Sequence, residues 1–540
     1  MIDLNADNRR EDAGKALFRT VIEDDNSERR IVSFIDENKA YHELTGHEYA
    51  QMVNALSTQI AKRTTDIPAG AWAALSVRVH QYWHAAFFGL LACGFNVLLL
   101  DRSFDHERAE ACIDQADVRL IVADTNLSFS EVTTLNFDEL ITDAAATAAD
   151  DYTPLEDQPA WGGRLAYCTS GTTGSLSKLP VQDIGRITRS LCITRDTLLD
   201  NAEFVDGVCR GSLVGKRMLL TLPLHHNFGF LATLLFWMFE SCICFYDTRS
   251  VLDIIDAVKK LKVFILPTVP LVWKTMYNIM VARHGEASSQ AFSETFGSEL
   301  GFGIIGGAAM DPVIRKRLSD LGLSLCDVYG SSETPLVMLG IFSRSDVNRF
   351  GIRLSGYTTR ILDEDGTPHE RGIGELLIKG GMTYTGYLSD GKPLPVEVDA
   401  DGFVRTGDVF ELGEQDACLL GRYKNIIVNE DGENIYPEEL EVKFNFLLSD
   451  ADQYRVIGID ETPVLFVHAR DEGPSEEELV EKIRDANNQL EIYKRVRRLY
   501  FSTDSMPSGL KGVLGKLLPD ALGEHPEQFR EIPLIGRKAS

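Results

Sequence analysis

The fold is decided between residues 71 and 100, which read AWAALSVRVHQYWHAAFFGLLACGFNVLLL. A short apolar run, Ala71–Val77, predicts a buried strand. It is followed by Tyr82–Cys93, whose apolar residues recur at helical spacing, and then by a second strand-like run, Phe95–Leu100. A strand, a helix and another strand in this order predict two parallel strands joined by a crossover helix.

The same alternation extends as far as Val328. Further strand-like runs are Leu120–Ala123, Leu165–Cys168, Met218–Leu222, Ile243–Tyr246, Val263–Leu266 and Leu323–Val328. The segments between them, such as Val251–Lys260, suit amphipathic helices. The most apolar run, Phe228–Phe239, is too short to span a bilayer, so it predicts a buried helix. We therefore expect an α/β fold with largely parallel sheets.

The texture of the sequence changes after Arg349. Four Asp-Gly pairs indicate hairpins in a β-rich region, and they are Asp365-Gly366, Asp390-Gly391, Asp401-Gly402 and Asp431-Gly432. Beyond Gly421 the chain suits a small α+β domain with a helix over Glu476–Leu490, and a loosely held tail after about Glu524. We expect a large N-terminal domain, residues 1–421, with parallel-sheet α/β subdomains and a β-rich region, and a small mobile C-terminal domain, residues 422–540.

Composition limits the class of protein. The 540 residues carry a formal net charge of −27, which argues against a general nucleic-acid or anionic-membrane surface. The nine cysteines include no paired CxxC motif, unlike a disulfide framework or a zinc site. Residues 1–10 lack the apolar core of a signal peptide. We expect a cytoplasmic protein with no membrane span and no nucleic-acid partner.

A loop rich in glycine and hydroxyl groups follows the strand Leu165–Cys168 directly. Glycines let backbone amides close around an anion, hydroxyls add donors, and a nearby lysine adds positive charge. The pattern predicts a phosphate-binding loop, and the alternative is a flexible solvent loop. The candidate residues are Thr169, Ser170, Gly171, Thr172, Thr173, Gly174 and Lys178.

This loop resembles the phosphate loop of the acyl-AMP-forming superfamily, which contains acyl- and aryl-CoA synthetases, peptide-synthetase adenylation domains and firefly luciferase. The family form continues with any residue, proline, lysine and glycine. Here the Thr-Ser-Gly-Thr-Thr-Gly run is intact, but the proline is missing and Lys178 sits one residue late. The whole pattern is closest to the acyl-CoA synthetases, and the resemblance implies ATP and Mg²⁺ as cofactors and places Thr172 among the catalytic residues.

Further motifs follow in the family's order. Leu222–Asn227 reads LPLHHN and resembles the segment whose histidine, here His226, lines the acyl pocket beside the substrate carboxylate. The alternative for His226 is a packed histidine near a helix start. Relatives that activate amino acids carry an aspartate in this region to hold the ammonium group. None is present here, which favours an acid without an α-amino group.

Two segments resemble the family's adenine and magnesium sites. Gly306–Ala309 reads GGAA, whose small residues allow a flat ring to approach the backbone. Asp327–Thr334 reads DVYGSSET and resembles a Tyr-Gly-x-Thr-Glu motif. The resemblance assigns Gly307, Ala308, Asp327, Tyr329 and Gly330 to the nucleotide site, Ser332 to an α-phosphate or adenylate oxygen, and Glu333 to Mg²⁺ as well as to catalysis.

The downstream motifs are implied to hold the ribose and to move the small domain. Asp408, in Arg405–Asp408, would accept hydrogen bonds from both ribose hydroxyls. Arg422 would touch ribose or phosphate, Lys424 would be the hinge, and Gly432 would line the tunnel for the pantetheine thiol. Near the end, Gly515-Lys516-Leu517 favours Lys516 as the catalytic lysine, while the spacing from Pro507 leaves Lys511 as an alternative.

The implied function is activation of a small-molecule carboxylic acid as its acyl-AMP, followed by transfer to a thiol. CoA is the first choice of acceptor, and the phosphopantetheine of an acyl carrier protein is the alternative. The cluster Lys494, Arg495, Arg497 and Arg498 suits the 3′-phosphate of CoA, an acidic carrier protein or a solvated strand face. Two other classes stay open: a nucleotide-binding protein that has lost catalysis, and a phosphotransferase that makes ADP.

The two candidate lysines give a test of this mechanism. Replacing the correct one, Lys516 or Lys511, by alanine removes the charge that stabilises the transferring phosphate, so adenylation should fall about 100-fold or more. Thiol transfer from supplied acyl-AMP should be nearly unchanged, because the resemblance implies that rotation at Lys424 into a second conformation withdraws the lysine in that step. Both half-reactions are measured separately on each variant, with the other lysine as control. Equal loss of both half-reactions would contradict the two-conformation mechanism.

Overall fold

A computed structural model describes most of the chain. The described residues are 13–23, 27–147, 161–168, 178–205, 213–307, 310–340, 349–354, 356–429, 433–444, 446–447, 451–469, 474–502 and 529–534. The chain divides into two compact units. A large unit holds Met1–Ser345, Phe350–Thr358 and Ile378–Val404, and a small unit holds Asp346–Arg349, Thr359–Leu377 and Arg405–Ser540. The predicted domain division between residues 421 and 422 stays a prediction.

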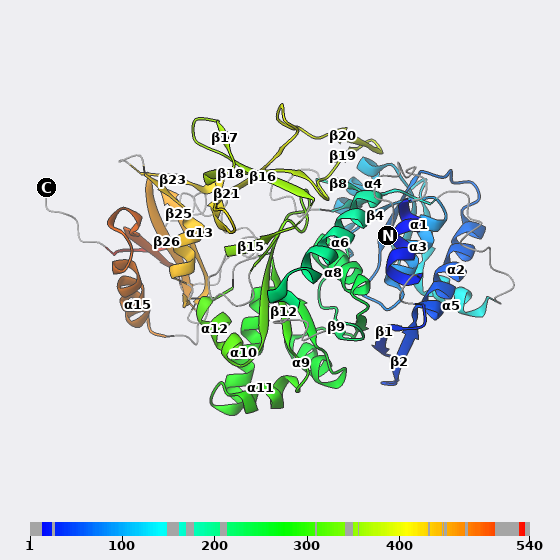
Figure 1. Cartoon of the computed structure of the whole chain (residues 1–540), viewed down its shortest axis with the longest axis horizontal. Helices are drawn as coiled ribbons and strands as arrows, with labels where there is room; N and C mark the ends of the chain where they lie inside the picture. Colours follow the sequence, from blue (N-terminus) through cyan, green and yellow to red (C-terminus); the bar gives the residue numbers. More distant parts are fainter. Residues whose placement is uncertain are drawn as a thin grey trace. The chain divides into compact units, whose positions relative to one another are not determined.

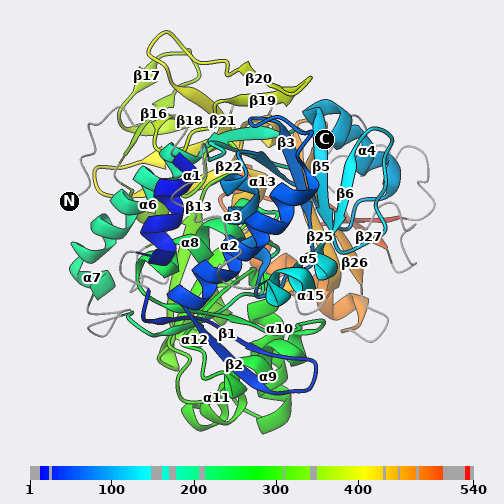
Figure 2. The ribbon, with the colours of Figure 1, turned by 90° about the vertical axis from the view of Figure 1, so that its right-hand side faces the viewer.

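The large unit contains an eight-stranded sheet, part of which faces the viewer in Figure 2. Its strands lie in the order β20-β19-β8-β7-β4-β3-β5-β6. Their bounds are β3 Trp72–Ser76, β4 Asn96–Leu99, β5 Val118–Ala123, β6 Thr133–Asn136, β7 Arg164–Tyr167, β8 Pro180–Asp183, β19 Gly386–Ser389 and β20 Lys392–Pro395. The five strands from β7 to β6 are parallel, and β8, β19 and β20 add antiparallel pairs.

The second sheet of the large unit contains the strands expected to carry the nucleotide site. Their order is β15-β14-β13-β12-β11-β9-β10-β1-β2. Their bounds are β1 Arg30–Ile35, β2 Tyr41–Thr45, β9 Arg217–Leu219, β10 Cys242–Phe245, β11 Ile265–Thr268, β12 Phe302–Gly306, β13 Ser324–Tyr329, β14 Met338–Gly340 and β15 Arg349–Arg353. The six strands from β13 to β1 are parallel, so their carboxyl ends share one edge.

Helices join and cover these strands (Figure 1). In the large unit they are α1 Ala13–Phe18, continued by the π-helix Arg19–Glu23, α2 Gly46–Arg63, α3 Trp83–Ala92, α4 His106–Ala116, α5 Phe137–Ala146, α6 Ile184–Leu199, α7 Ala202–Phe204, α8 Asn227–Met238, α9 Val251–Lys260, α10 Pro270–His284, α11 Ser289–Phe296 and α12 Pro312–Asp320. Capping boxes at Thr45 and Ser250 fix where α2 and α9 begin, because each satisfies backbone N–H groups of the first turn.

Helices α3 and α8 form the centre of the main core. Every residue of α3 and ten residues of α8 are buried, and strands of both sheets contribute to the same hydrophobic cluster. A helix that is apolar on all sides requires such surroundings. The buried helix expected over Phe228–Phe239 is therefore confirmed. No helix within the described ranges is both long and apolar enough to cross a membrane.

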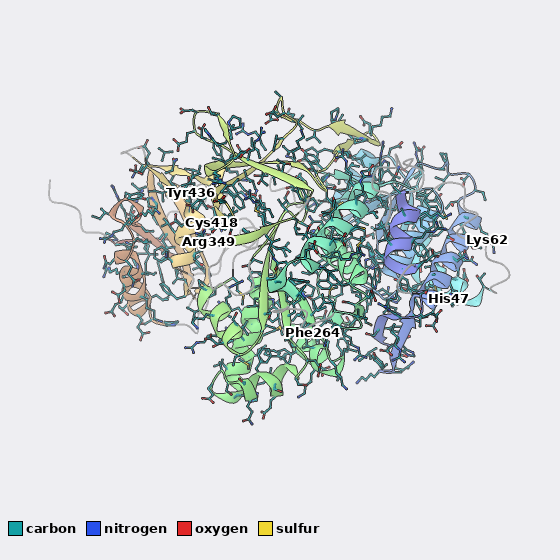
Figure 3. All side chains as sticks on the ribbon, viewed as in Figure 1. His47, Lys62, Phe264, Arg349, Cys418 and Tyr436 are labelled. Carbon is teal, nitrogen blue, oxygen red and sulfur yellow. The ribbon has the colours of Figure 1, made fainter. Side chains whose placement is uncertain are left out.

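The small unit combines a β-rich part with a compact α+β part. The first holds β17 Pro368–His369, β22 Ala417–Arg422 and most of β16 Tyr357–Leu362, β18 Gly372–Gly380 and β21 Val404–Leu412. The second has β23 Ile427–Val428, β24 Asn434–Ile435, α13 Pro437–Lys443, β25 Ala451–Ile459, β26 Thr462–Ala469, α15 Glu476–Asn488, β27 Arg498–Ser502 and β28 Arg530–Pro533. Arg349, labelled in Figure 3, pairs with Asp416 of this unit at 2.6 Å between Nη1 and Oδ2.

Most sequence-based expectations of secondary structure are confirmed, including the strand, helix and strand at residues 71–100 and the helix near Glu476. Two are wrong. Asp401-Gly402 forms a turn before β21 and does not join two paired strands, because Phe403 N and Gly402 N bond locally to Asp399. The expected loose tail contains β28, whose residues pair with β27 since that sheet edge offers free backbone partners.

Because the core around α8 is densely packed, truncating one of its large side chains should strongly destabilise the large unit. Phe230 is fully buried, and its ring lies 5.0 Å from Phe87 and 5.9 Å from His84 between centroids. The Phe230→Ala change should lower the unfolding free energy of the large unit by about 3–5 kcal/mol, because it removes the ring and leaves a cavity. Denaturant unfolding followed by fluorescence measures the change. The exposed control Leu252→Ala should stay within about 0.5 kcal/mol, and equal effects of the two would contradict the assignment of this core.

Candidate functional site

Four of the predicted nucleotide-site residues lie at one edge of the second sheet. In the parallel pair β12 and β13, Ile305 is level with Asp327 and Gly306 with Val328. Gly307, one residue past β12, therefore lies beside Tyr329, the last residue of β13, and Gly330 follows. The carboxyl ends of parallel strands are where ligands bind in open α/β sheets. This edge thus meets the geometric requirement for the predicted nucleotide site.

The turn after β13 holds Ser332 and Glu333. Ser331 Oγ accepts hydrogen bonds from the backbone N–H groups of Glu333 and Thr334 at 3.2 and 3.1 Å. Two side chains from elsewhere fix the turn. Asn227 Nδ2 donates to Ser331 O at 2.7 Å, and Gln182 Nε2 donates to Ser332 O at 3.1 Å. The first residue of α8 and strand β8 therefore set the position of this turn.

Glu333 is held by a tyrosine that sequence reasoning did not select. Tyr387 Oη donates to Glu333 Oε1 at 2.9 Å, and the same ring lies 5.1 Å from Lys178 Nζ. Burial and the neighbouring Glu333 carboxylate raise the pKa of Tyr387, so its hydroxyl stays protonated and can donate. Tyr387 thus links the predicted magnesium ligand to the predicted phosphate-loop lysine. The segment Gly386-Tyr387-Leu388 carries no local signal of this contact, since 54 residues separate the two partners.

Asp327 is buried and paired inside the protein. Arg315 Nη1, from α12, donates to Asp327 Oδ1 at 2.9 Å. Burial raises the pKa of Asp327, and the guanidinium of Arg315 opposes that rise. The pair fixes α12 against β13, because breaking it would leave a buried charge without a partner. A contact of Asp327 with the adenine amino group stays a prediction.

His226 caps the start of α8 and lies beside two other possible metal ligands. Its ring centroid is 4.4 Å from that of His225, and His225 Nε2 lies 3.4 Å from Asp101 Oδ2. Ligand atoms of Asp101, His225 and His226 all fall within 4.8 Å of one another, so this group could hold a metal ion. Desolvation lowers the pKa of both histidines, that of His225 to about 4, while Asp101 opposes the shift. Both rings are therefore neutral near pH 7 and can accept a hydrogen bond or a metal ion.

The predicted ribose ligands lie together in the small unit. Asp408 and Arg422 are opposite each other on β21 and β22, with 2.6 Å between Arg422 Nε and Asp408 Oδ1. Asp408 is almost fully buried, whereas the Arg422 side chain is half exposed. Thr406 Oγ1 accepts from Asp408 N at 3.1 Å, and Gly407 N donates to Glu375 Oε1 at 3.0 Å. These bonds fix the backbone that presents the Asp408 carboxylate.

Several predicted residues lie outside the described ranges. They are Thr169, Ser170, Gly171, Thr172, Thr173, Gly174, Ala308, Gly432, Lys511 and Lys516. Lys424 is described and lies in the short 3-10 helix Tyr423–Asn425. In the basic cluster, Lys494 pairs with Glu439, and Arg498 lies 3.3 Å from Asp460. These two charges are thus balanced within the small unit.

The residues present fit the cofactors that the sequence implies. Glu333 offers a carboxylate oxygen, the kind of ligand that Mg²⁺ prefers, and Tyr387 orients it. Tyr329 offers an aromatic face, and its ring already lies 5.8 Å from that of Phe350. In the small unit, Asp408 and Arg422 offer an acceptor and a cation suited to a ribose phosphate.

Comparison with known proteins is consistent with this chemistry. Residues 20–388 match the model of a family described as AMP-binding enzyme. The chain is similar to the acyl-CoA ligase cnsG of Penicillium expansum, 26% identical over 289 residues, which are 52% of this chain and 56% of that protein. It is also similar to a long-chain-fatty-acid–CoA ligase of Haemophilus influenzae, 26% identical over 316 residues, or 56% of this chain and 54% of that protein. The chain spans about half the length of the curated relatives it matches.

A solved structure matches nearly the whole fold. The ATP-bound MatB from Rhodopseudomonas palustris superposes with a TM-score of 0.71 at 20% identity, covering 91% of this chain and 95% of that chain. At this identity the likeness shows the fold alone. It confirms the expected α/β fold with a large N-terminal and a small C-terminal part.

Tyr387 gives a test of the site as described. The Tyr387→Phe change removes the hydroxyl that orients Glu333, so the Mg²⁺ concentration needed for half-maximal pyrophosphate release should rise about 10-fold. Titration of Mg²⁺ at saturating ATP measures the shift. The matched control is Tyr277→Phe, because Tyr277 packs against a different hydrophobic cluster. An unchanged Mg²⁺ requirement in Tyr387→Phe would mean that Glu333 is not the ligand.

Proposed function

Because the chain belongs to the AMP-binding enzyme family, we propose that it activates a carboxylic acid with ATP to form an acyl-AMP and pyrophosphate. The acyl group then passes to the thiol of CoA. The single observation that supports this proposal most is the family match over residues 20–388, which includes the turn with Glu333 and the tyrosine that orients it. The names of the similar proteins, which are CoA ligases, support CoA as the acceptor.

The chemistry assigns each residue a task. Attack of a carboxylate on the α-phosphate brings two anions together, so their charge must be offset by cations and hydrogen-bond donors. We assign Mg²⁺ binding to Glu333 and donation to the α-phosphate to Ser332 and to the loop hydroxyl of Thr172. When bound, Mg²⁺ supplies charge neutralisation at the phosphates. Lys516, or Lys511, supplies a further cation.

The remaining roles concern orientation. The neutral ring of His226 faces the acyl carboxylate, and Tyr329 stacks on adenine at the strand edge with Gly307, Ala308 and Gly330. Asp408 accepts from the ribose hydroxyls, and the neighbouring Arg422 pairs with that carboxylate and orients it.

Movement and location complete the proposal. Lys424 is the hinge of the small domain, residues 422–540, and Gly432 lines the thiol path. A cytoplasmic location and an acid without an α-amino group are parts of the same proposal.

A carrier-protein phosphopantetheine is the second acceptor to test. Both acceptors present the same thiol arm, and they differ in what lies beyond it. Within the basic cluster, the internal pairing of Lys494 and Arg498 leaves less positive charge for a large acidic partner, which favours free CoA. Supplying CoA and phosphopantetheinylated carrier protein separately, after acyl-AMP formation, distinguishes them by the acyl thioester that forms.

The proposed reaction predicts acid-dependent exchange of pyrophosphate into ATP, with AMP and not ADP as the product. Asp408→Asn should raise the KM for ATP by about 10-fold to 100-fold, because a charge-assisted hydrogen bond to ribose is lost. Asp401→Asn, in an exposed turn, serves as the matched control and should leave KM unchanged. Absence of exchange with every acid tested would identify a protein that has lost catalysis, and formation of ADP would identify a phosphotransferase.

A further inference from the structure

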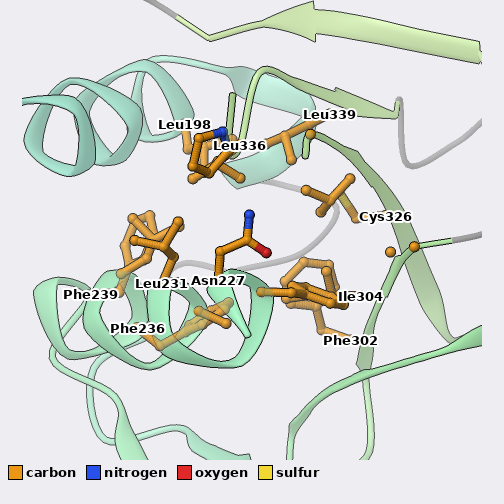
Figure 4. Close-up of a pocket in the computed structure, with 18 of the residues that line it drawn as sticks. Leu198, Asn227, Leu231, Phe236, Phe239, Phe302, Ile304, Cys326, Leu336 and Leu339 are labelled. Carbon is orange, nitrogen blue, oxygen red and sulfur yellow. The ribbon is translucent and has the colours of Figure 1, made fainter. Parts of the chain in front are cut away.

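The large unit contains an apolar cavity of about 150 Å³ beside the predicted nucleotide edge (Figure 4). Its walls come from one face of α8, one face of the second sheet, helices α6 and α7, and the segment before β14. The lining residues that close it are Leu198, Phe204, Phe236, Phe239, Phe302 and Leu339. Figure 4 shows Asn227 projecting from α8 into the space between Leu336 and Ile304.

The periodicity of the elements explains why the cavity is continuous. On α8, Asn227, Leu231, Leu235 and Phe239 recur every four residues, so they form one stripe that lines the cavity. This stripe extends about 18 Å along the helix, given its rise of about 1.5 Å per residue. The long axis of the cavity therefore follows α8, from its first residue to its C-cap.

The wall of the cavity that the second sheet forms consists of alternate residues of its strands, because successive side chains of a strand point to opposite faces. On β12, Phe302, Ile304 and Gly306 share one face, and on β13 and just beyond it, Cys326, Val328 and Gly330 do the same. Asp327 and Tyr329 alternate to the opposite face. One face of β13 thus carries the apolar cavity, while the other carries residues predicted for the nucleotide.

The lining differs between the two ends of the α8 stripe. At the first end Asn227, Gly307 and Gly330 line the cavity, and they neighbour His226 and the turn with Glu333 in the chain. At the other end four phenylalanine rings pack against one another. The centroid of Phe204 lies 5.7 Å from that of Phe239 and 6.3 Å from that of Phe302. The ring of Phe236 contacts the rings of Phe239 and Phe302. We call Phe204, Phe236, Phe239 and Phe302 the phenylalanine stop.

The chemistry of the lining is uniform. Among the described residues that line the cavity there is no Asp, Glu, Lys, Arg or His, and the one side-chain amide, Asn227, donates to Ser331 O. A charged group on the acyl tail would be buried there without a partner, which strongly disfavours its binding. An uncharged apolar tail instead gains free energy as its surface leaves water.

We propose that this cavity binds the acyl tail of the substrate, and that the substrate is an uncharged apolar acid of about six to ten carbon atoms. The size follows from the volume, because a cavity of about 150 Å³ takes a six-carbon ring such as benzene, and from the further length along α8. The phenylalanine stop sets the upper limit. This inference depends on the proposed adenylation activity for its kinetic readout, but not for its binding readout.

The first experiment compares acids of matched length. Pyrophosphate release gives kcat/KM for hexanoate, octanoate, decanoate, hexadecanoate, phenylacetate and octanedioate. Octanoate or decanoate should be preferred among the linear acids, and octanedioate, whose second carboxylate would be buried, should be at least about 100-fold poorer than octanoate. Phenylacetate distinguishes a cavity that accepts a ring from one that accepts only a linear tail. Equal activity with octanedioate, or a preference for hexadecanoate, would overturn the inference.

The second experiment moves the stop. Phe239→Ala should open the closed end and raise the ratio of kcat/KM for hexadecanoate over octanoate by about 10-fold or more, as expected for several methylene groups newly accommodated. Phe239→Leu is a milder second variant in case the first is unstable. The matched control Phe129→Ala removes a mostly buried phenylalanine of another cluster, so it should leave that ratio unchanged. An unchanged ratio in both Phe239 variants would contradict the assignment of the stop.

Calorimetric titration of octanoate and octanedioate separates this inference from the proposed function. If octanoate binds and octanedioate does not, while no acid yields AMP, the adenylation activity is refuted and the apolar cavity is supported. If other acids yield AMP while octanoate and decanoate neither bind nor react, the activity stands and the inference is wrong. Loss of octanoate binding on Gly306→Val, whose side chain would enter the space next to Phe228, should accompany the first result.

Discussion

The structure depends on the need to bury a helix that is apolar on every side. Helix α8 cannot expose any face to water, so both sheets of the large unit contribute strands to the core around it. It connects β9 to β10, which are parallel, and therefore begins at the carboxyl ends of the strands. That position brings His226 and Asn227 to the same edge as Gly307 and Tyr329. The burial of α8 thus determines which edge of the sheet carries the polar residues of the candidate site.

The polar site is fixed by contacts between residues distant in the sequence. The turn at Ser331 is held by Asn227 and by Gln182, whose donor lies 150 residues away. Glu333 in turn depends on Tyr387. A carboxylate that must hold a metal ion with defined geometry gains from such partners, because they limit its rotamers before the ligand arrives. A substitution at Gln182 in β8 or at Tyr387 in β19 would therefore alter the position of Glu333.

The sequence predicted the fold well, since strand and helix periodicities are local and residues 71–100 already contain a complete unit. The sequence-based predictions were wrong where the local structure depends on contacts with residues distant in the sequence. Residues 530–533 look like a polar tail, yet they complete a sheet beside β27. Asp401-Gly402 has the composition of a hairpin turn and β21 follows it, but no strand that pairs with β21 directly precedes it. Tyr387 could not be selected, because nothing local distinguishes a tyrosine that orients a carboxylate from one that packs.

The same strand serves two chemically opposite surfaces, and the alternation of side chains makes this possible. Along β13, Cys326 and Val328 face the cavity, whereas Asp327 pairs with Arg315 on the other side. Gly330 directly follows the strand where the two surfaces meet, and a Cβ there would come within 2.5 Å of Leu336 N. A side chain at this point would displace the backbone at Leu336, which also lines the cavity. Glycine is therefore required at this position by the close approach of the Leu336 backbone.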